Sequence, residues 1–140
     1  MDAVLLNKAF QLFISASNLP DNTIASIVSC STAEMSCINM KYRGTEGSTD
    51  VLSFPAASNS AFSSLENHND NYLGEILIDI NYINMHKESD NMEKEIIIVF
   101  IHGLLHLIGY DHLNTNQKIK MQAQEKIILD RILQDGLIER

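Results

Sequence analysis

Three histidines with helical spacing are the residues of this chain best suited to chemistry. His102, His106 and His112 lie in the segment HGLLHLIGYDH, which includes the end of the most apolar run of the sequence. On an α-helix, positions i and i+4 are roughly 40° apart around the axis and about 6 Å apart along it. The imidazoles of His102 and His106 can therefore reach one metal ion from a single turn.

The third histidine can join this pair only if the helix ends between His106 and His112. In a continuous helix, His112 would lie about 9 Å beyond His106 and on another face, too far to share an ion through bonds of roughly 2 Å. Gly109 stands where the helix must stop, and glycine readily takes the left-handed conformation that turns the chain. The spacing predicts a helix that ends at Gly109 and returns His112 as a third ligand.

Three neutral imidazoles favour zinc, one ion per chain, and leave a fourth coordination position open. An open position is typical of catalytic sites, because structural zinc sites are usually closed and rich in cysteine. The metzincin peptidases have the same histidine spacing, but they carry Glu directly after the first histidine as general base. Here that position is Gly103, which cannot accept a proton. The pattern predicts an enzyme with a metzincin-like zinc-binding helix that lacks the peptidase base.

Composition and charge limit the possible classes of protein. With 140 residues, 45% of them hydrophobic, residues 1–140 are expected to form a single domain with a substantial core. The start, MDAVLLNKAF, has no cationic segment typical of a signal peptide, and no apolar run is long enough for a bilayer. We expect a cytoplasmic protein without membrane contact. A formal net charge of -8 argues against nonspecific attraction to nucleic acid, so DNA is not expected as a partner and any RNA needs a local basic patch or a delivering partner.

Periodicity and turn residues predict helices and strands in alternation. Helices are expected at Ala3–Asn18, from the capping pair Ser31/Glu34 to Gly44, at Asn81–Lys87, from the capping pair Asp90/Glu93 to Gly109, and at Thr115–Gln134. Strands are expected at Thr23–Cys30, Asp50–Phe54 and Leu73–Ile80. The last helix is predicted to bury its apolar residues at 119, 123, 127, 128 and 132. The Ser- and Asn-rich segment Ala56–Asn71 is predicted to be a mobile loop.

The remaining polar candidates have alternative interpretations. Asp111 can orient a ligating imidazole or serve as a turn residue beside Gly109. Glu75 either faces the site or lies on the solvent face of its strand, and the second interpretation is favoured. His68 and His86 are expected to face solvent, and Cys30 and Cys37 are expected to be structural.

Three motifs in this order are similar to those of the YbeY family of bacterial endoribonucleases. They are NMKYRGTEGSTDVLSFP at Asn39–Pro55, LGEILI at Leu73–Ile78 and HGLLHLIGYDH at His102–His112. The resemblance covers roughly residues 22–133. It implies an α+β fold with a small mixed β-sheet of three to four strands packed with about five helices. It also implies cleavage of single-stranded RNA in ribosomal RNA maturation and ribosome quality control, with the ribosome or ribosomal proteins as partners.

The same resemblance carries over four residues by motif position. His102, His106 and His112 match the family's zinc ligands, and Arg43 matches an arginine tied to activity. Arg43 and His102 are therefore the predicted catalytic residues. A guanidinium offers a phosphate fixed charge and paired donors, while zinc activates water and neutralises a phosphate oxygen.

The general base and the nucleophile remain open at this stage. Asp111, Glu75, a substrate oxygen or hydroxide on the metal can act as base, and either water or the RNA 2′-hydroxyl can attack. Glu75 also departs from the family, which commonly has Asp there. Two other functions are alternatives: a peptidase-like zinc hydrolase that recruits its base from elsewhere, and a noncatalytic ribosome-associated factor whose metal only holds the fold.

Overall fold

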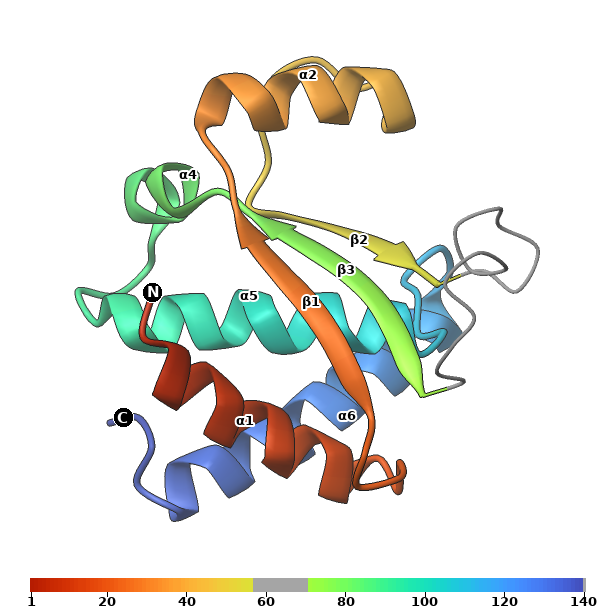
Figure 1. Ribbon diagram of the computed structural model, residues 1–140, viewed down its shortest axis with the longest axis vertical. Coiled ribbons are helices and arrows are strands. Elements are labelled where there is room, and N and C mark those ends of the chain that lie inside the picture. Colours follow the sequence, from red (N-terminus) through yellow and green to blue (C-terminus); the bar gives the residue numbers. More distant parts are fainter. Residues whose placement is uncertain (57–70, 140) are drawn as a thin grey trace.

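A three-stranded sheet forms the centre of the computed structural model, which describes residues 1–56 and 71–139 (Figure 1). Its strands are β1 (Ile24–Ser29), β2 (Val51–Pro55) and β3 (Tyr72–Ile78). The order is β1-β3-β2, with β1 parallel and β2 antiparallel to the central β3. The predicted small mixed sheet is confirmed, with three strands in the described part of the chain.

The helices cover both faces of this sheet. They are α1 (Ala3–Ala16), α2 (Thr32–Arg43), α4 (Ile80–His86), α5 (Met92–Leu107) and α6 (Thr115–Gln134). Figure 1 shows α5 running beneath the strands with α1 and α6 on its far side, and α2 on the opposite side of the sheet. The α+β class is therefore confirmed. Within the described ranges, no helix combines the length and apolar character needed to cross a membrane.

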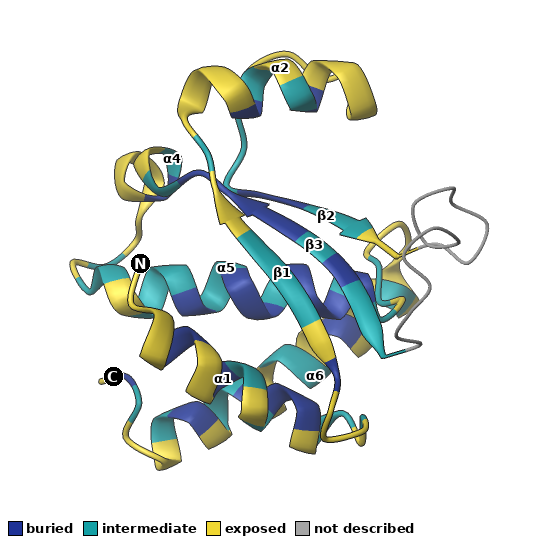
Figure 2. Ribbon diagram, in the orientation of Figure 1, coloured by how far each residue is buried: buried dark blue, intermediate teal, exposed yellow. Residues whose placement is uncertain are grey.

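Two apolar clusters hold these layers together, and the dark blue of β3 and of much of α5 in Figure 2 marks the larger one. This cluster joins α5 to α1, α6 and one face of the sheet. The smaller cluster lies under α2 on the other face and consists of Met35, Leu52 and Leu77. Because β3 is buried on both faces, Ile76 and Leu77 point to different cores.

Gly103 allows α5 to lie unusually close to the sheet. A Cβ atom at this position would lie 3.0 Å from Val51 Cγ2, 3.2 Å from Ser53 Oγ and 3.3 Å from Ile76 Cγ2. The Ser53 hydroxyl also donates a hydrogen bond of 2.9 Å to the Gly103 carbonyl. The helix that carries the histidines is thus fixed directly to β2 and β3.

The structure corrects two predicted element boundaries. Strand β3 ends at Ile78 and not at Ile80, because Asp79 leaves the strand and caps α4 by accepting from the Tyr82 amide at 3.0 Å. The capping pair predicted before α5 is also wrong. Asn91 is the N-cap, and its side chain accepts from the Lys94 amide at 3.1 Å.

The buried face of α6 also differs from the prediction. Ile119 and Ile127 were expected in the core but are 58% and 51% exposed, while Met121, Ile128 and Ile132 are buried. The buried residues share a face with Glu125, since positions 121, 125, 128 and 132 follow helical spacing. A carboxylate within the stripe weakened the apolar pattern, so the periodicity pointed to the neighbouring face.

Four smaller predictions have mixed outcomes. His86 is exposed, as expected, and stacks on Tyr82. Both cysteines are free, with Cys30 partly buried and Cys37 exposed. Residues 57–70, which hold most of the predicted mobile loop and His68, lie outside the described part of the chain.

Asp79 joins three elements at the end of β3 although its side chain is fully buried. Besides capping α4, its carboxylate accepts from Thr32 Oγ1 at 3.2 Å and from Ser48 Oγ at 2.7 Å. Burial alone would raise the pKa of Asp79, but these hydrogen bonds outweigh it and hold the pKa below the ordinary value. The ionised carboxylate is therefore part of the folded structure.

We expect Asp79→Asn to lower the free energy of unfolding at pH 7 by about 1–3 kcal/mol, because charged hydrogen bonds are replaced by weaker ones. Since the folded pKa is depressed, the ionised group stabilises the protein above its unfolded pKa of about 3.9, and this contribution is lost as pH falls through the folded pKa. Urea denaturation of parent and variant from pH 7 to pH 3 measures it. A difference that stays constant down to pH 3 would contradict this account.

Candidate metal centre

The end of α5 has the geometry that the sequence predicted. The helix stops at Leu107, and Gly109 follows in the left-handed region with φ 103°. The Gly109 amide donates to the His106 carbonyl at 3.1 Å, and the Tyr110 amide donates to the Leu105 carbonyl at 3.0 Å. These two bonds form a Schellman motif, which turns the chain sharply after a helix. The prediction of a helix stop at Gly109 is confirmed.

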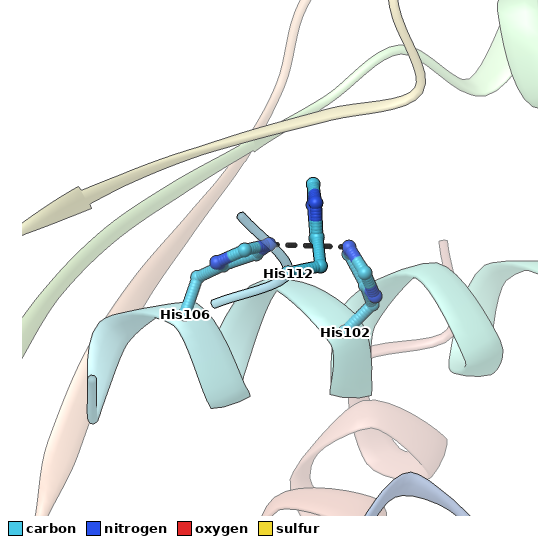
Figure 3. A group of neighbouring side chains, drawn as sticks. All are labelled: His102, His106 and His112. Carbon is cyan, nitrogen blue, oxygen red and sulfur yellow. Dashed lines mark hydrogen bonds between the residues drawn. The ribbon is translucent and has the colours of Figure 1, made fainter. Parts of the chain in front are cut away.

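This turn brings the three histidine rings together (Figure 3). His102 Nε2 and His106 Nε2 are 3.2 Å apart, and one ring nitrogen from each of the three histidines lies within 4.8 Å of the others. Two nitrogens bonded to one tetrahedral zinc at about 2.0–2.1 Å are roughly 3.3 Å apart. The spacing of His102 and His106 fits this value, and His112 lies within a small movement of it. Three convergent imidazoles fit a zinc ion.

The charge state of His106 also suits metal binding. Its burial lowers the pKa, and the neighbouring rings of His102 and His112 lower it further, against smaller opposing effects of a hydrogen bond with the Tyr110 backbone and the charge of Asp111. His106 therefore stays neutral to lower pH than an ordinary histidine. A neutral imidazole keeps the lone pair that a metal requires.

Glu125 is a functional candidate that was not among the residues predicted from the sequence. Its Oε1 atom lies 3.1 Å from His102 Nδ1, the ring nitrogen that does not face His106. The signal was present in the sequence only as a carboxylate at helical spacing between Met121 and Ile128, both buried. That pattern shows neither that the partner of Glu125 lies on another helix nor which face of α6 carries Glu125.

Arg43 lies in the same hollow as the histidines although it comes from the other side of the sheet. The hollow has a volume of about 550 Å³, and Arg43, His102, His106 and His112 all line it. Arg43 is the last residue of α2, which ends where Gly44 takes φ 66°, as the sequence predicted. Among residues 1–56 and 71–139, its guanidinium forms no hydrogen bond or ion pair, so its donors are available to a ligand.

The two carboxylates proposed as general bases are placed differently. Asp111 lines the hollow and accepts from the His112 amide at 2.8 Å, so it is a turn residue that also borders the histidines. Glu75 follows Gly74 on β3 on the same face as Leu77, which packs under α2, and it does not line the hollow. Its interpretation as a carboxylate facing the site is therefore wrong. The favoured solvent-face interpretation holds only in part, because Glu75 is half-buried.

The position of the peptidase base is tightly packed. Gly103 follows His102 and faces Val51, Ser53 and Ile76, and a Cβ there would lie 3.0–3.3 Å from their side-chain atoms, which would have to shift slightly. Gly103 does not line the hollow that holds the histidines. A side chain at this position would therefore start in the packing between α5 and the sheet and not beside the imidazoles.

Comparisons with known proteins agree with this site. A family model described as Endoribonuclease YbeY matches residues 3–133. Endoribonuclease YbeY of Lachnoclostridium phytofermentans is 30% identical, with 94% of this chain and 88% of that protein covered. The same-named protein of Finegoldia magna is 34% identical, with coverages of 80% and 71%.

A solved structure agrees at the level of the fold. The solution structure of a Thermotoga maritima protein matches 96% of this chain and 85% of its own, with a TM-score of 0.61 at 24% identity. The sequence relationships are closer and extend over most of the chain, including the histidine segment and the segment of Arg43. On this evidence, the chain belongs to the endoribonuclease YbeY family.

Proposed function

We propose that this chain is a single-strand-specific, zinc-dependent endoribonuclease that acts on ribosomal RNA during its maturation and in ribosome quality control. The observation that carries the proposal is the convergence of three imidazoles in one hollow with a guanidinium that has no partner in the described part of the chain. Membership of the endoribonuclease YbeY family supports RNA as the substrate. The proposed setting is the cytoplasm, with the ribosome or ribosomal proteins as partners.

In this proposal the residues of the hollow have separate chemical roles. His102, His106 and His112 hold one zinc ion, which when bound supplies a Lewis acid that activates water and neutralises charge on a phosphate oxygen. Arg43 donates paired hydrogen bonds to the scissile or a neighbouring phosphate and stabilises the charge that develops there. Asp111 borders the same space and is a carboxylate that can accept a proton there.

The surface beside Arg43 supports a single-stranded substrate. The Tyr42 ring is 63% exposed and is held edge-on against Phe54, with ring centroids 5.4 Å apart. Lys41 Nζ lies 5.6 Å from the centre of the Tyr42 ring. An exposed ring next to Lys41, and followed in the sequence by Arg43, can stack an unpaired base while the two cations contact the backbone. Lys41 and Arg43 supply the local positive charge that an acidic chain needs to bind RNA.

Two alternatives receive less support. A peptidase-like zinc hydrolase would have to recruit its base from elsewhere, because Gly103 follows the first histidine, and the matching family model describes an endoribonuclease. A noncatalytic factor with a structural metal needs neither an open hollow at its metal nor an available arginine beside it. The hollow is present here, and Arg43, which lines it, has no partner among the described residues.

The first test compares substrates. We expect the zinc-loaded protein to hold about one zinc per chain and to cleave single-stranded RNA, because the hollow combines an open metal centre with a phosphate-binding guanidinium. It should leave an unfolded protein substrate intact. Elemental analysis and gel-based cleavage assays measure both properties.

Histidine variants provide the control for this test. His106→Ala should lose zinc and cleavage together, whereas His86→Ala removes an exposed histidine outside the hollow and should change neither. Equal zinc content in the parent and in His106→Ala would contradict the three-histidine centre. Cleavage of unfolded protein in place of RNA would favour the peptidase alternative.

Gly109 tests whether the helix stop is required to bring in His112. We expect Gly109→Val to weaken zinc binding by at least about tenfold, because a β-branched residue resists φ 103° although no atom would clash with its Cβ. Gly136→Val is the matched control, since Gly136 also has positive φ and open space but follows α6. Zinc titration of both variants decides. Parental affinity in Gly109→Val would show that the turn does not set the ligand geometry.

Arg43→Lys separates a catalytic role for Arg43 from a structural one at the end of α2. Lysine suits a helix C-terminus equally well but lacks the planar fork that grips a phosphate. We expect the variant to melt close to the parent and keep its zinc, yet to cleave RNA at least about tenfold more slowly. Arg131→Lys, in the last turn of α6, is the matched control and should cleave normally. Full cleavage by well-folded Arg43→Lys would leave Arg43 with a structural role only.

A further inference from the structure

Glu125 holds one of the three histidines from outside the hollow. It lies on α6, and its Oε1 atom is 3.1 Å from Nδ1 of His102 on α5. The Nε2 atom of the same ring faces His106 Nε2 at 3.2 Å. We propose that Glu125 is a positioning residue that fixes the orientation and tautomer of His102, so that His102 presents Nε2 to the metal. This role rests on the three-histidine centre proposed above.

The hydrogen-bonding capacity of the two groups gives the mechanism. A carboxylate only accepts hydrogen bonds, so the short contact requires the hydrogen to be on His102 Nδ1. In the neutral ring, which is the form that binds a metal, the hydrogen is then not on Nε2, and the Nε2 lone pair faces the other ligands. Without Glu125, a neutral His102 can carry its hydrogen on either nitrogen and can rotate about its side-chain bonds. Part of the population would then offer the metal no lone pair.

The position of Glu125 argues for a specific role. Its side chain is only 21% exposed and lies on the buried face of α6, between Met121 and Ile128. Taking a carboxylate into such surroundings costs free energy unless a partner compensates for it. Within the described ranges, His102 is its only hydrogen-bond partner. An apolar residue at this position would extend the core without that cost.

A purely structural interpretation of the contact is weaker. Helices α5 and α6 are already joined through the main apolar cluster, to which both contribute fully buried residues such as Leu104 and Ile128. Another carboxylate on α6, that of Asp130, forms an exposed i,i+4 ion pair with Lys126 and contacts no histidine. Exposed pairs of that kind contribute little to stability. Because the apolar cluster already joins α5 to α6, the Glu125 contact matters mainly for what it does to the His102 ring.

The decisive variants remove the acceptor while keeping the shape. Glu125→Met and Glu125→Leu both fill the buried face of α6 with helix-forming apolar side chains. Glu125→Gln keeps an oxygen that can accept from Nδ1 but removes the charge. Asp130→Asn is the matched control, because it removes a carboxylate from the same helix five residues away. Having two acceptor-free variants allows for one of them packing poorly.

Three measurements separate positioning from packing. The zinc dissociation constant comes from competition with a chromophoric chelator, the stability of the metal-free protein from its melting temperature, and the His102 tautomer from side-chain ¹⁵N shifts of the metal-free protein. We expect Glu125→Met and Glu125→Leu to melt at or above the parent but to bind zinc 10- to 100-fold more weakly, about the usual effect of losing such a partner. Their His102 should lose the Nδ1–H signature. Glu125→Gln should keep that signature and most of the affinity, and Asp130→Asn should match the parent.

Each other outcome overturns the role. If both acceptor-free variants bind zinc as tightly as the parent, the positioning role of Glu125 is wrong, while the three-histidine centre is still supported. An affinity loss that only follows a fall in metal-free stability, or that appears equally in Asp130→Asn, makes Glu125 a packing residue. If the His102 tautomer is unchanged in the acceptor-free variants, Glu125 does not set that tautomer and the proposed mechanism is wrong. A parent protein that binds no zinc overturns the three-histidine centre itself, and the Glu125 role with it.

Discussion

The packing of α5 against the sheet at Gly103 is the contact that sets where the histidine cluster lies relative to β2 and Arg43. A Cβ at Gly103 would lie only 3.0 Å from Val51 Cγ2, so the glycine lets the helix lie closer to β2 than most other residues would. The Ser53 hydroxyl fixes the same point by donating to the Gly103 carbonyl. Since His102 is the preceding residue, its place relative to β2 follows from this contact. The strand β2 in turn borders the hollow that Arg43 reaches from α2, so one glycine relates the two halves of the site.

The parts of the site that could be predicted from the sequence are those that one local segment determines. The i, i+4 histidines need only helical geometry, and the return of His112 needs only a left-handed residue at Gly109. The end of α2 at Gly44 follows the same rule. Such features depend on backbone conformations that one or two residue types favour strongly. The mixed order of the sheet and the placing of Arg43 beside the histidines came from the family resemblance, because pairing between distant strands leaves no local mark.

The features that were missed depend on contacts between distant segments. Glu125 and His102 are 23 residues apart and meet only because α6 packs on α5. A carboxylate on a buried face also lowers the apolar signal of that face, which made Ile119 and Ile127 look like core residues. The end of β3 was misplaced for a similar reason. Asp79 continues the alternation of the strand in sequence, but its partners Thr32 and Ser48 come from other elements and draw it into a buried cap.

The charges around the hollow bear on how the proposed RNA substrate and the proposed metal ion bind together. Its charged residues other than histidine are Arg43, Asp50 and Asp111, whose formal charges sum to -1 while the imidazoles are neutral. A hollow of that charge, in a chain with a net charge of -8, repels a phosphodiester backbone. In the proposed function, a divalent cation held by the three imidazoles would change the same sum to +1, and the hollow would then attract a phosphate near Arg43. The lowered pKa of His106 favours a neutral ring, so that the positive charge would come from the bound ion. Under this proposal, the acidic surroundings would make RNA binding at the hollow depend on metal binding.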